Sequence, residues 1–492
     1  MNLRNKKWKL VSTLLSGALL LSVVSGCSGD GKDGSNAGKK VSITVSNYDI
    51  ETLKDDSPYI KRLRELSGYD IDFTWVPVDK YKERLSTSIA GENLTDIVVG
   101  SSTDGPIYNA IKSGLFWEVG PYLKEFPNLA GLNEQVLNNT KVDGKIYGVY
   151  RARPLSREGI IFRKDWLDNL GLEAPDTYDE FIDLLYAFTN DDPDGNGKDD
   201  TYGIFAGGGN VRAFLTMHGV AQKWHLEEDG TINVWFLTEP FKDVVRLFKK
   251  MYDDGVIPTD YLLLKEPEEM NKSHIGIKTG ALDDVDKLFK ELPKLTPTAV
   301  LDVMQYPKGP DGVRRAKGTS GFNGMYMIPK TSVKTEERLK EVLGFLDMLW
   351  SPDGQNLFNW GLEDVNYKVE DGKAIVTNPD FGKNAQDIFQ IRSDDGKKAL
   401  PGAEDAVNSK VKKLQTESES FAIFDPTTNI DSETYNERGK QLEKDVEAAM
   451  NKYITGEIAE DELDKAIQSW KELGGDQILK EFNEAYQKQN SN

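Results

Sequence analysis

Residues 41–47, VSITVSN, form a run of β-branched and small side chains that is typical of a buried strand. The next stretch, PYIKRLRELSG at 58–68, has helical spacing of apolar residues and ends at a glycine. A second alternating run, YDIDFTWVPV at 69–78, predicts another strand. Strands that alternate with helices indicate an α/β fold with a parallel sheet.

The pattern continues with a predicted helix at 79–91 and a short buried strand at 95–102. In parallel sheets, ligands bind at the carboxyl ends of the strands. We therefore expect Asn47–Asp49 and Ser101–Asp104 to lie near any binding crevice.

Beyond this region, helical and strand-like patterns alternate over the rest of the chain. Thr177 and Glu180 form a capping box that predicts a helix start. The sequence predicts further strands at 145–154, 201–207 and 324–330, a strand followed by a helix at 158–172, and a helix, a turn at Gly114 and a second short helix over 108–126. It also predicts helical segments at 239–255 and 335–355 and a helix-rich end beyond residue 432.

The N-terminus has the features of a lipoprotein signal peptide. Four basic residues precede an apolar stretch, Leu10–Val24, which is shorter than the roughly 20 residues of a membrane-spanning helix. Ser25 and Gly26 stand directly before Cys27, as in a bacterial lipobox. Cleavage after residue 26 would leave Cys27 to carry a diacylglycerol. The alternative is an ordinary secretory signal with an incidental cysteine, but Cys27 is the only cysteine and has no partner for an internal disulfide.

The charge of the chain restricts its partners. Residues 1–26 hold four basic residues and no acidic ones, so their removal changes the formal charge from −20 to −24. Such an acidic chain is not expected to bind nucleic acid or anionic membranes by charge. Residues 27–40 are the lipidated Cys27 and a flexible tether. The membrane link is therefore expected to be the lipid alone, with two acyl chains for stable anchoring.

The loop DDPDGNGKDD, residues 191–200, matches most of an EF-hand calcium loop. The sequence does not follow the full motif, because position twelve, normally glutamate, is Gly203 and the flanks read as helix and strand. We interpret the loop as a structural Ca²⁺ clip; the alternative is a metal-free turn. The predicted ligands are Asp192, Asp194, Asn196, Lys198 through its carbonyl, and Asp200.

Motifs for catalysis are missing from the sequence. The three histidines are scattered, and neither a nucleophile elbow nor a phosphate-binding loop is present. A glycosidase needs only two carboxylates, so composition cannot exclude one. Tryptophans at turns, Trp117 and Trp360, suit stacking on sugar rings, although core packing is the alternative for each.

Taken together, these segments resemble the extracellular solute-binding lipoproteins of bacterial ABC importers, closest to the family-1 oligosaccharide binders of Gram-positive bacteria. The resemblance covers nearly the whole chain. The residues that carry it are TDIVVG (95–100), SGLFWEVGPYL (113–123), GKIYGVYRARP (144–154), FRKDWLDNLGLEAPDTYDEF (162–181), DPDGNGKDDTYG (192–203), SPDGQNLFNWGLEDVNYKVEDGK (351–373) and GGDQILKEFNEAYQK (474–488).

The resemblance implies a two-lobed, periplasmic-binding-protein-like α/β fold of type II, with a hinge and a ligand cleft between the lobes. It implies residues 41–152 plus 278–318 for the N-terminal lobe and 153–277 plus 319–492 for the C-terminal lobe. The alginate-binding members hold a structural calcium in a similar loop, and Thr201 stands where they offer a glutamate. The implied ligand-binding residues are Tyr48, Asp49, Ser102, Asp104, Trp117, Tyr150, Arg151, Trp224, Trp235, Asn323 and Trp360.

The function that the resemblance implies is that of a binding protein without catalytic residues. It would capture an oligosaccharide and deliver it to the permease subunits of an ABC transporter. We expect a monomer, anchored by lipid on the outer face of the cell membrane of a Gram-positive bacterium. A peptide-binding receptor, a lipid-anchored polysaccharide hydrolase or lyase, and a lipoprotein that only presents a surface are the alternatives. Arg151 with Arg153 could focus positive potential for an acidic sugar, or could simply be solvated.

Overall fold

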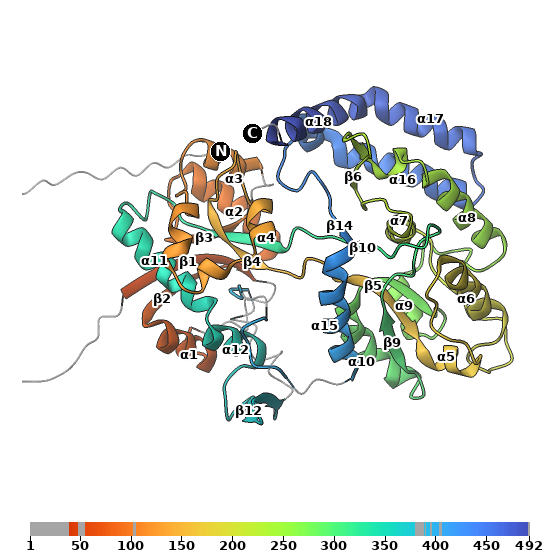
Figure 1. Ribbon diagram of the computed structural model, residues 1–492, viewed down its shortest axis with the longest axis horizontal. Helices are drawn as coiled ribbons and strands as arrows, with labels where there is room; N and C mark the ends of the chain where they lie inside the picture. The colour runs from red at the N-terminus through yellow and green to blue at the C-terminus, as the bar shows by residue number, and fades with distance from the viewer. Residues whose placement is uncertain are drawn as a thin grey trace, which may run out of the picture. The chain divides into compact units, whose positions relative to one another are not determined.

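The computed structural model describes residues 39–47, 55–101, 105–378, 388, 390–393, 396–402 and 406–490. Lys39–Asn492 forms one compact unit (Figure 1). The predicted signal peptide, Cys27 and the tether up to residue 38 lie outside the described residues. Lys39 and Lys40, which were assigned to the tether, begin the first strand instead. Among the helices that are described, none combines the length and the apolar character needed to span a bilayer.

The first sheet has five strands in the order β2-β1-β3-β11-β4. Strands β1 (Lys39–Asn47), β2 (Tyr69–Pro77) and β3 (Ile97–Gly100) are parallel, which confirms the predicted strand–helix–strand start. Strand β11 (Phe322–Met327) lies between β3 and β4 (Gly148–Ala152) and is antiparallel to both. The sheet is therefore mixed, and β4 runs in the same direction as β1 and β3.

Helices cover both faces of this sheet (Figure 1). The side chains of β1 alternate: Val41, Ile43 and Val45 are buried on the face that carries α1 and α11, and Ser42 and Thr44 face α2. The helices of this half are α1 (Pro58–Ser67), α2 (Val78–Ala90), α3 (Gly105–Lys112), α4 (Glu134–Asn139), α11 (Glu336–Leu349) and α12 (Pro352–Trp360), with 3-10 turns η1 (Gly120–Glu125) and η2 (Leu129–Gly131). A hairpin of β12 (Tyr367–Glu370) and β13 (Lys373–Val376) follows α12.

The second sheet has three strands in the order β8-β5-β9, and both pairings are antiparallel. It consists of β5 (Glu158–Arg163), β8 (Ile277–Ala281) and β9 (Leu301–Met304). Around it lie α5 (Lys164–Asn169), α6 (Tyr178–Asn190), α7 (Gly208–Met217), α8 (Phe241–Asp253), α9 (Glu266–Asn271), η4 (Leu282–Asp284), α10 (Val285–Leu295) and α15 (Ala406–Ser418). The capping box at Thr177 and Glu180 starts α6 as predicted.

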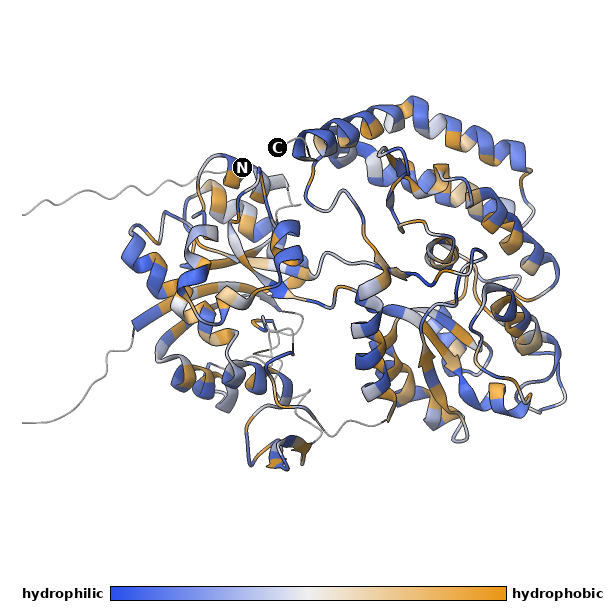
Figure 2. Ribbon diagram, in the orientation of Figure 1, coloured by the Kyte–Doolittle hydropathy of each residue, from blue (hydrophilic) through white to orange (hydrophobic). Residues whose placement is uncertain are grey.

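The helix-rich end predicted from the sequence is confirmed. Helices α16 (Lys440–Ile454), α17 (Glu460–Trp470) and α18 (Asp476–Asn490) pack on the core of the second sheet. Each shows apolar and polar residues on different sides, as expected for helices half-buried at a surface (Figure 2). The remaining elements are β6 (Trp224–Leu226), β7 (Ile232–Val234), η3 (Trp235–Leu237), β10 (Ala316–Lys317), η5 (Glu419–Phe421), β14 (Ala422–Ile423), and the π-helical turns η6 (Tyr435–Gly439) and η7 (Lys471–Gly475).

The two sheets have separate hydrophobic cores, and this division differs from the predicted one. Residues 278–318 were assigned to the N-terminal lobe, but β8 and β9 pair with β5 in the second sheet. Conversely, β11, α11 and α12 belong to the first core and not to the C-terminal lobe. The prediction of these boundaries was wrong because the pairing partners are far apart in sequence: Ile161 lies opposite both Lys278 and Val303.

One of two local predictions also differs from the structure. Residues 201–207 do not form a strand, and Tyr202 makes only an isolated bridge to Ile275. Tyr202 donates its N–H to the carbonyl of His274, so the segment pairs with the chain around Ile275 at this one position. The predicted helix, turn at Gly114 and second short helix over 108–126 correspond to α3, to Gly114 with its φ of 81°, and to the 3-10 turn η1.

Candidate functional site

Three parallel strands of the five-stranded sheet end at its carboxyl edge, and a fourth, antiparallel strand begins there. Strands β1, β3 and β4 end there at Asn47, Gly100 and Ala152, and β11 begins there at Phe322. Because ligands in α/β proteins bind outside such an edge, it is the candidate site. Tyr48, Asp49, Ser102 and Asp104, which follow β1 and β3 in the chain, are predicted site residues that lie outside the described residues.

A bulge in β11 brings Asn323 to this edge. The register between β11 and β4 shifts between Phe322 and Met325, and Asn323 is exposed. Gly324 has a φ of 77°, which favours glycine. A bulge at a sheet edge redirects a side chain away from the ladder, so the exposed Asn323 is accessible at this edge, and its ligand role stays a prediction.

Arg151 is the charged side chain of β4 next to this edge. It is 5% exposed, and its Nε donates to the carbonyl of Arg392 at 3.5 Å. Arg392 in turn donates to Oδ1 of Asn359, near the end of α12, at 3.3 Å. Arg392 and Asn359 are site neighbours that sequence reasoning missed, and no motif around Arg392 could have revealed them.

Trp360 ends α12 and connects the two halves of the protein. Its Nε1 donates to the carbonyl of Leu400 at 2.9 Å, and Lys412 of α15 lies 5.6 Å from its ring centroid. A Cβ on Gly402 would come within 2.1 Å of the ring, so glycine is needed beside it. Since α15 packs on the second core, Trp360 contacts both halves.

The other predicted aromatic ligands lie away from this edge. Trp117 follows a bridge from Phe116 to Pro329 beyond the far end of β11, and its Nε1 donates to the carbonyl of Val333. Tyr150 is buried, and its hydroxyl accepts from the N–H of Asn133 at 2.8 Å. The ligand roles of these two residues remain predictions that the packing does not support.

Trp224 and Trp235 are core side chains of the second half. Trp224 is buried and packs on Phe482 of α18, with the two ring centroids 4.7 Å apart. Trp235 packs edge-on against Phe236 and Phe241. Both rings are enclosed by other aromatic side chains, so their position favours the core interpretation that the sequence left open.

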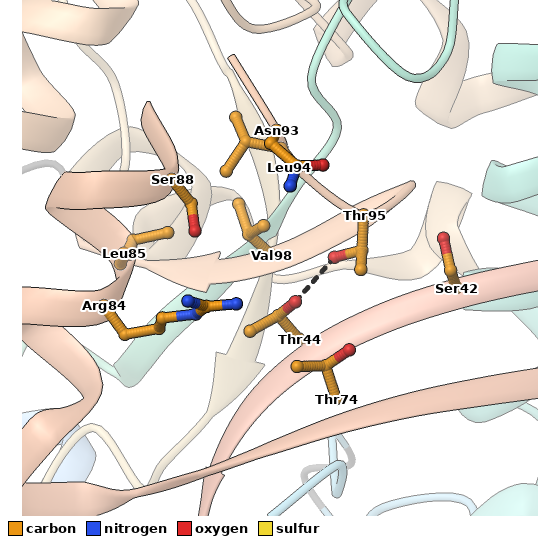
Figure 3. Close-up of a pocket in the computed structure, with 10 residues that line it drawn as sticks. All are labelled: Ser42, Thr44, Thr74, Arg84, Leu85, Ser88, Asn93, Leu94, Thr95 and Val98. Carbon is orange, nitrogen blue, oxygen red and sulfur yellow. Dashed lines mark hydrogen bonds between the residues drawn. The ribbon is translucent and has the colours of Figure 1, made fainter. Parts of the chain in front are cut away.

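A polar pocket of about 220 Å³ lies between the first sheet and α2 (Figure 3). It is lined by Ser42, Thr44, Thr74, Arg84, Leu85, Ser88, Asn93, Leu94, Thr95 and Val98. The hydroxyls of Thr44 and Thr95 are hydrogen-bonded at 2.8 Å, and Arg84 extends from α2 toward them. Because Ser42 and Thr95 stand near the beginnings of β1 and β3, the pocket is separate from the carboxyl edge.

In the loop at 192–201, acidic side chains lie around the side-chain amide of Asn196. Nδ2 of Asn196 donates to Asp194 at 2.9 Å and to Asp200 at 3.1 Å. The carboxylate of Asp192 accepts the backbone N–H groups of Asn196 and Gly197, both at 3.0 Å. Burial raises the pKa of Asp194, and the carboxylates of Asp192 and Asp200 raise it further. A cation would offset this concentration of negative charge.

Two further features of the loop are relevant to whether it binds a metal ion. The hydroxyl of Thr201 is buried and has no hydrogen-bond partner within the described part of the chain. A Cβ at Gly203 would lie 2.4 Å from the carbonyl of Leu185, which explains why no glutamate can stand at position twelve. In the described ranges, no group of three or more His, Cys, Asp or Glu side chains has an arrangement ready for a metal ion.

The segments that connect the two halves lie side by side. The N–H of Thr319 donates to the carbonyl of Leu155, and that of Gly318 donates to Ile423 of β14, each at 2.8 Å. Strand β10, just before Gly318, pairs with β14. Such short crossing strands can absorb rotation as a hinge.

Comparison with known families and proteins gives a consistent match. The family model for "Bacterial extracellular solute-binding protein" matches residues 59–383. The polygalacturonan/rhamnogalacturonan-binding protein YtcQ of Bacillus subtilis is 33% identical over 498 residues, which cover 98% of this chain and 99% of that protein. Lipoprotein LipO of the same organism is 33% identical over 512 residues, which cover 98% of each chain.

Solved structures confirm the predicted two-lobed α/β fold. An "HMO binding ABC-transporter associated Solute Binding Protein" of Bifidobacterium longum infantis has a TM-score of 0.70 at 17% identity, covering 92% of this chain and 99% of that one. Alginate-binding protein AlgQ2 without calcium ion has a TM-score of 0.63 at 16% identity, covering 92% and 98%. An EF-hand mutant of FusA from S. pneumoniae has a TM-score of 0.59 at 18% identity, covering 92% and 100%.

Proposed function

Because the chain belongs to the bacterial extracellular solute-binding protein family, we propose that it captures an oligosaccharide outside the cell and delivers it to an ABC permease. The observation that carries this proposal is the full-length similarity to a relative named for binding polygalacturonan and rhamnogalacturonan. The same similarity favours a carbohydrate over a peptide as the ligand. The alternative of a peptide receptor therefore has no support here.

The proposed site is the carboxyl edge of the first sheet. Asn323 and Arg151 supply polar groups from β11 and β4, and Trp360 supplies a ring at the contact with α15. Flat aromatic faces suit the C–H faces of sugars, and amide and guanidinium groups suit their oxygens. Ligand binding would favour a closed arrangement in which both halves contact the sugar, through the crossing segment at Gly318. Release to the permease would follow from the difference in affinity between the two arrangements.

We infer that the chain is held at the membrane by a lipid on Cys27 and acts as a monomer without turnover of its ligand. A relative named as a lipoprotein supports the lipid anchor. The test replaces Cys27 by serine and measures the fraction of the protein that moves from the membrane to the medium. Full retention of that variant would contradict the anchor.

Oligosaccharide binding is expected to raise the unfolding temperature of the full chain. At 100 times its Kd, a ligand adds about 2.7 kcal/mol to the free energy of unfolding, which is a shift of several degrees. The measurement is thermal unfolding in detergent against a panel of plant and microbial oligosaccharides, with peptides as controls. Chromatography of the sugar afterwards distinguishes binding from cleavage. A midpoint that moves with peptides alone, or a cleaved sugar, would contradict the proposal.

We also propose that Ca²⁺ binds in the loop 192–201, with oxygens from Asp192, Asp194, Asn196, Asp200 and the carbonyl of Lys198. Burial, and after it the carboxylates of Asp192 and Asp200, raise the pKa of Asp194, and the ion would offset the negative charge that these groups concentrate. In the proposed site, the amide of Asn196 rotates so that its oxygen replaces the nitrogen between Asp194 and Asp200. Thr201 follows Asp200 in the chain, and its buried hydroxyl, which has no hydrogen-bond partner within the described residues, would be a further oxygen ligand.

Chelation of calcium is expected to lower the unfolding midpoint by a few degrees. A site with a Kd of roughly 10⁻⁴ M in about 2 mM Ca²⁺ contributes about 1–2 kcal/mol. The measurement compares EDTA with Ca²⁺ for the wild type, for Asp194→Asn and for the control Asp199→Asn, which changes a carboxylate outside the proposed ligand set. The effect of EDTA should vanish only in Asp194→Asn. Equal unfolding midpoints of the wild type in both buffers would mean that the loop is a metal-free turn.

A further inference from the structure

The polar pocket between the first sheet and α2 lies where a helix-covered sheet normally has an apolar face (Figure 3). Parallel strands that are covered on both faces usually carry apolar side chains on both. The α1 side of β1 follows this rule, because Ile43 and Val45 are buried there. On the α2 side, the floor of the pocket consists of hydroxyl-bearing residues instead: Ser42, Thr44 and Thr74. Such departures from the local rule are typical of functional sites.

Helix α2 covers this floor without filling the space above it. Leu85 is the buried residue of α2, and Arg84 and Ser88 line the pocket beside it. The pocket has a volume of about 220 Å³. A cavity of roughly 15 Å³ holds one water molecule, so this pocket has room for a ligand of several heavy atoms.

The lining of the pocket carries a positive charge and no negative one. Ten residues line it, of which Arg84 is basic and none is acidic. The chain as a whole has the opposite balance, with 81 acidic against 61 basic residues. Asp96 follows the lining residue Thr95, but its carboxylate pairs with Arg338 at 2.9 Å and accepts the N–H of Ser42 at 3.0 Å. The charge of Asp96 is therefore offset outside the pocket.

Arg84 has no counter-charge within the described residues. Its side chain extends from α2 toward Thr44, and it makes no hydrogen bond or ion pair to any residue that the structure describes (Figure 3). Every other described arginine has at least one such partner, for example Glu65 for Arg62. The undescribed segments 48–54 and 102–104 follow the carboxyl ends of β1 and β3, whereas the pocket lies near the beginnings of these strands.

Three neutral side chains from different elements line the pocket together with Arg84. Thr74 belongs to β2, Ser88 to α2 and Asn93 to the loop after α2, and none of these side chains has a hydrogen-bond partner among the described residues. The hydroxyl of Thr95, by contrast, donates to a backbone carbonyl at 2.7 Å and is bonded to Thr44 at 2.8 Å. A guanidinium, two hydroxyls and an amide are thus available to one ligand.

We propose that this pocket binds a tetrahedral oxyanion, a phosphate or sulfate group carried by a small molecule. The guanidinium of Arg84 can give two parallel hydrogen bonds to two oxygens of such a group. The remaining oxygens of a tetrahedral anion point in other directions, where the hydroxyl and amide donors from β2, α2 and the loop can meet them. A planar carboxylate has only two oxygens and would leave most of these donors unused.

The net charge of the chain makes this binding depend on short-range contacts. A formal charge of −20 repels anions at long range, so an anion is retained only where the local donors outweigh that repulsion. Because the pocket is separate from the carboxyl edge of the sheet, the anion is not a competitor of the oligosaccharide. The inference therefore goes beyond the proposed function and does not depend on it.

The test is isothermal titration calorimetry of the full chain in detergent, in a phosphate-free buffer of fixed ionic strength. The probes are inorganic phosphate, inorganic sulfate and glycerol 3-phosphate, and planar acetate is the control ion. The variants are Arg84→Met, Arg84→Lys and Thr74→Val, of which the last removes a hydroxyl and keeps the shape of the side chain. The control Arg62→Met removes an exposed arginine of α1, which lies on the other face of the sheet.

At least one tetrahedral probe is expected to bind the wild type with one-to-one stoichiometry, about tenfold or more tightly than acetate. Arg84→Met should weaken that binding by about 10- to 100-fold, because two hydrogen bonds from a charged group are lost. Arg84→Lys should retain part of the affinity, since it keeps the charge but not the fork. Thr74→Val should weaken binding by about two- to tenfold, and Arg62→Met by less than about twofold.

The order of affinities among the probes identifies the source of the anion. Tighter binding of glycerol 3-phosphate than of inorganic phosphate would indicate a phosphate ester, and the reverse order would indicate the free ion. Tighter binding of sulfate than of both would indicate a sulfate group. Without ligand, Arg84→Met should unfold at the temperature of the wild type, because Arg84 is exposed. If this variant is less stable, Thr74→Val tests the pocket without a change of charge.

Four results would overturn the inference. A wild type that binds none of the three probes has no oxyanion site, and acetate bound as tightly as the probes would make the tetrahedral class wrong. If Arg84→Met and Thr74→Val bind the probes as the wild type does, the anion lies elsewhere. If Arg62→Met loses as much affinity as Arg84→Met, the binding is a non-specific effect of charge. Each of these results leaves the proposed oligosaccharide function unchanged, because the sugar panel tests a different site.

Discussion

Replacing Asp165 by alanine is expected to lower the free energy of unfolding by about 3–5 kcal/mol. Asp165 follows β5 in the first turn of α5, and its carboxylate accepts from Nε and Nη2 of Arg163. Arg163 also donates to Ser273 at 3.0 Å and lies 4.6 Å over the ring of Trp166. Without Asp165, a guanidinium that is almost fully buried loses its counter-charge inside the second core.

The matched control for this prediction removes both charges. In Arg163→Met with Asp165→Ala, an apolar chain occupies the space over Trp166, and the double variant should be more stable than Asp165→Ala alone. Urea unfolding followed by tryptophan fluorescence, with the slope fitted for each variant, measures the difference. If the double variant were less stable than the single one, the charge would not be the cause of the loss.

Replacing Asp347 by alanine is expected to cost about 3–4 kcal/mol. Oδ1 of Asp347 accepts the backbone N–H groups of Asn128 and Leu129 at 2.8 and 2.9 Å, and Oδ2 accepts the side-chain amide of Asn128 at 2.9 Å. The side chain of Asp347 is 9% exposed. Its removal leaves these N–H groups without a partner, and each unsatisfied buried donor costs about 1–3 kcal/mol.

Asp347→Asn is the informative companion variant. Its Oδ1 can still accept both backbone N–H groups, but its NH₂ faces the amide of Asn128, so one hydrogen bond becomes a repulsion. We expect a loss of about 1–2 kcal/mol, smaller than that of the alanine variant. The same urea experiment applies. An asparagine variant as unstable as the alanine variant would mean that charge, and not the backbone hydrogen bonds, is what Asp347 supplies.

These two aspartates show which part of the fold the sequence could predict. The strand–helix–strand start and the helix at α11 follow from local patterns of apolar residues, and both predictions were confirmed. Asp347 lies within α11, and from the sequence alone a charged residue in such a helix is expected to face the solvent. Its partners are 218 and 219 residues away. No local pattern contains that information.

The candidate site was likewise predictable only in part from the sequence. The carboxyl edge and Asn323 were predictable, because strand direction follows from the chain order and the resemblance marks the segment. The burial of Arg151 was not, since it depends on residues around Ile391 that cover the sheet from far along the chain. Trp224 and Trp235 were predicted as ligands from the family resemblance, and aromatic residues of α8 and α18 pack against them instead.

The position of β11 between β3 and β4 has a consequence for how the protein is made. The partner of Gly100 in the neighbouring strand is Met325, so the first sheet stays open until that residue has left the ribosome. At roughly 5–20 residues per second, this takes on the order of ten to fifty seconds after β3 has been synthesised. During that time β3 presents an unpaired edge, which is a template for pairing with another chain. The edge of β3 is therefore exposed to pairing with other chains until β11 has been synthesised.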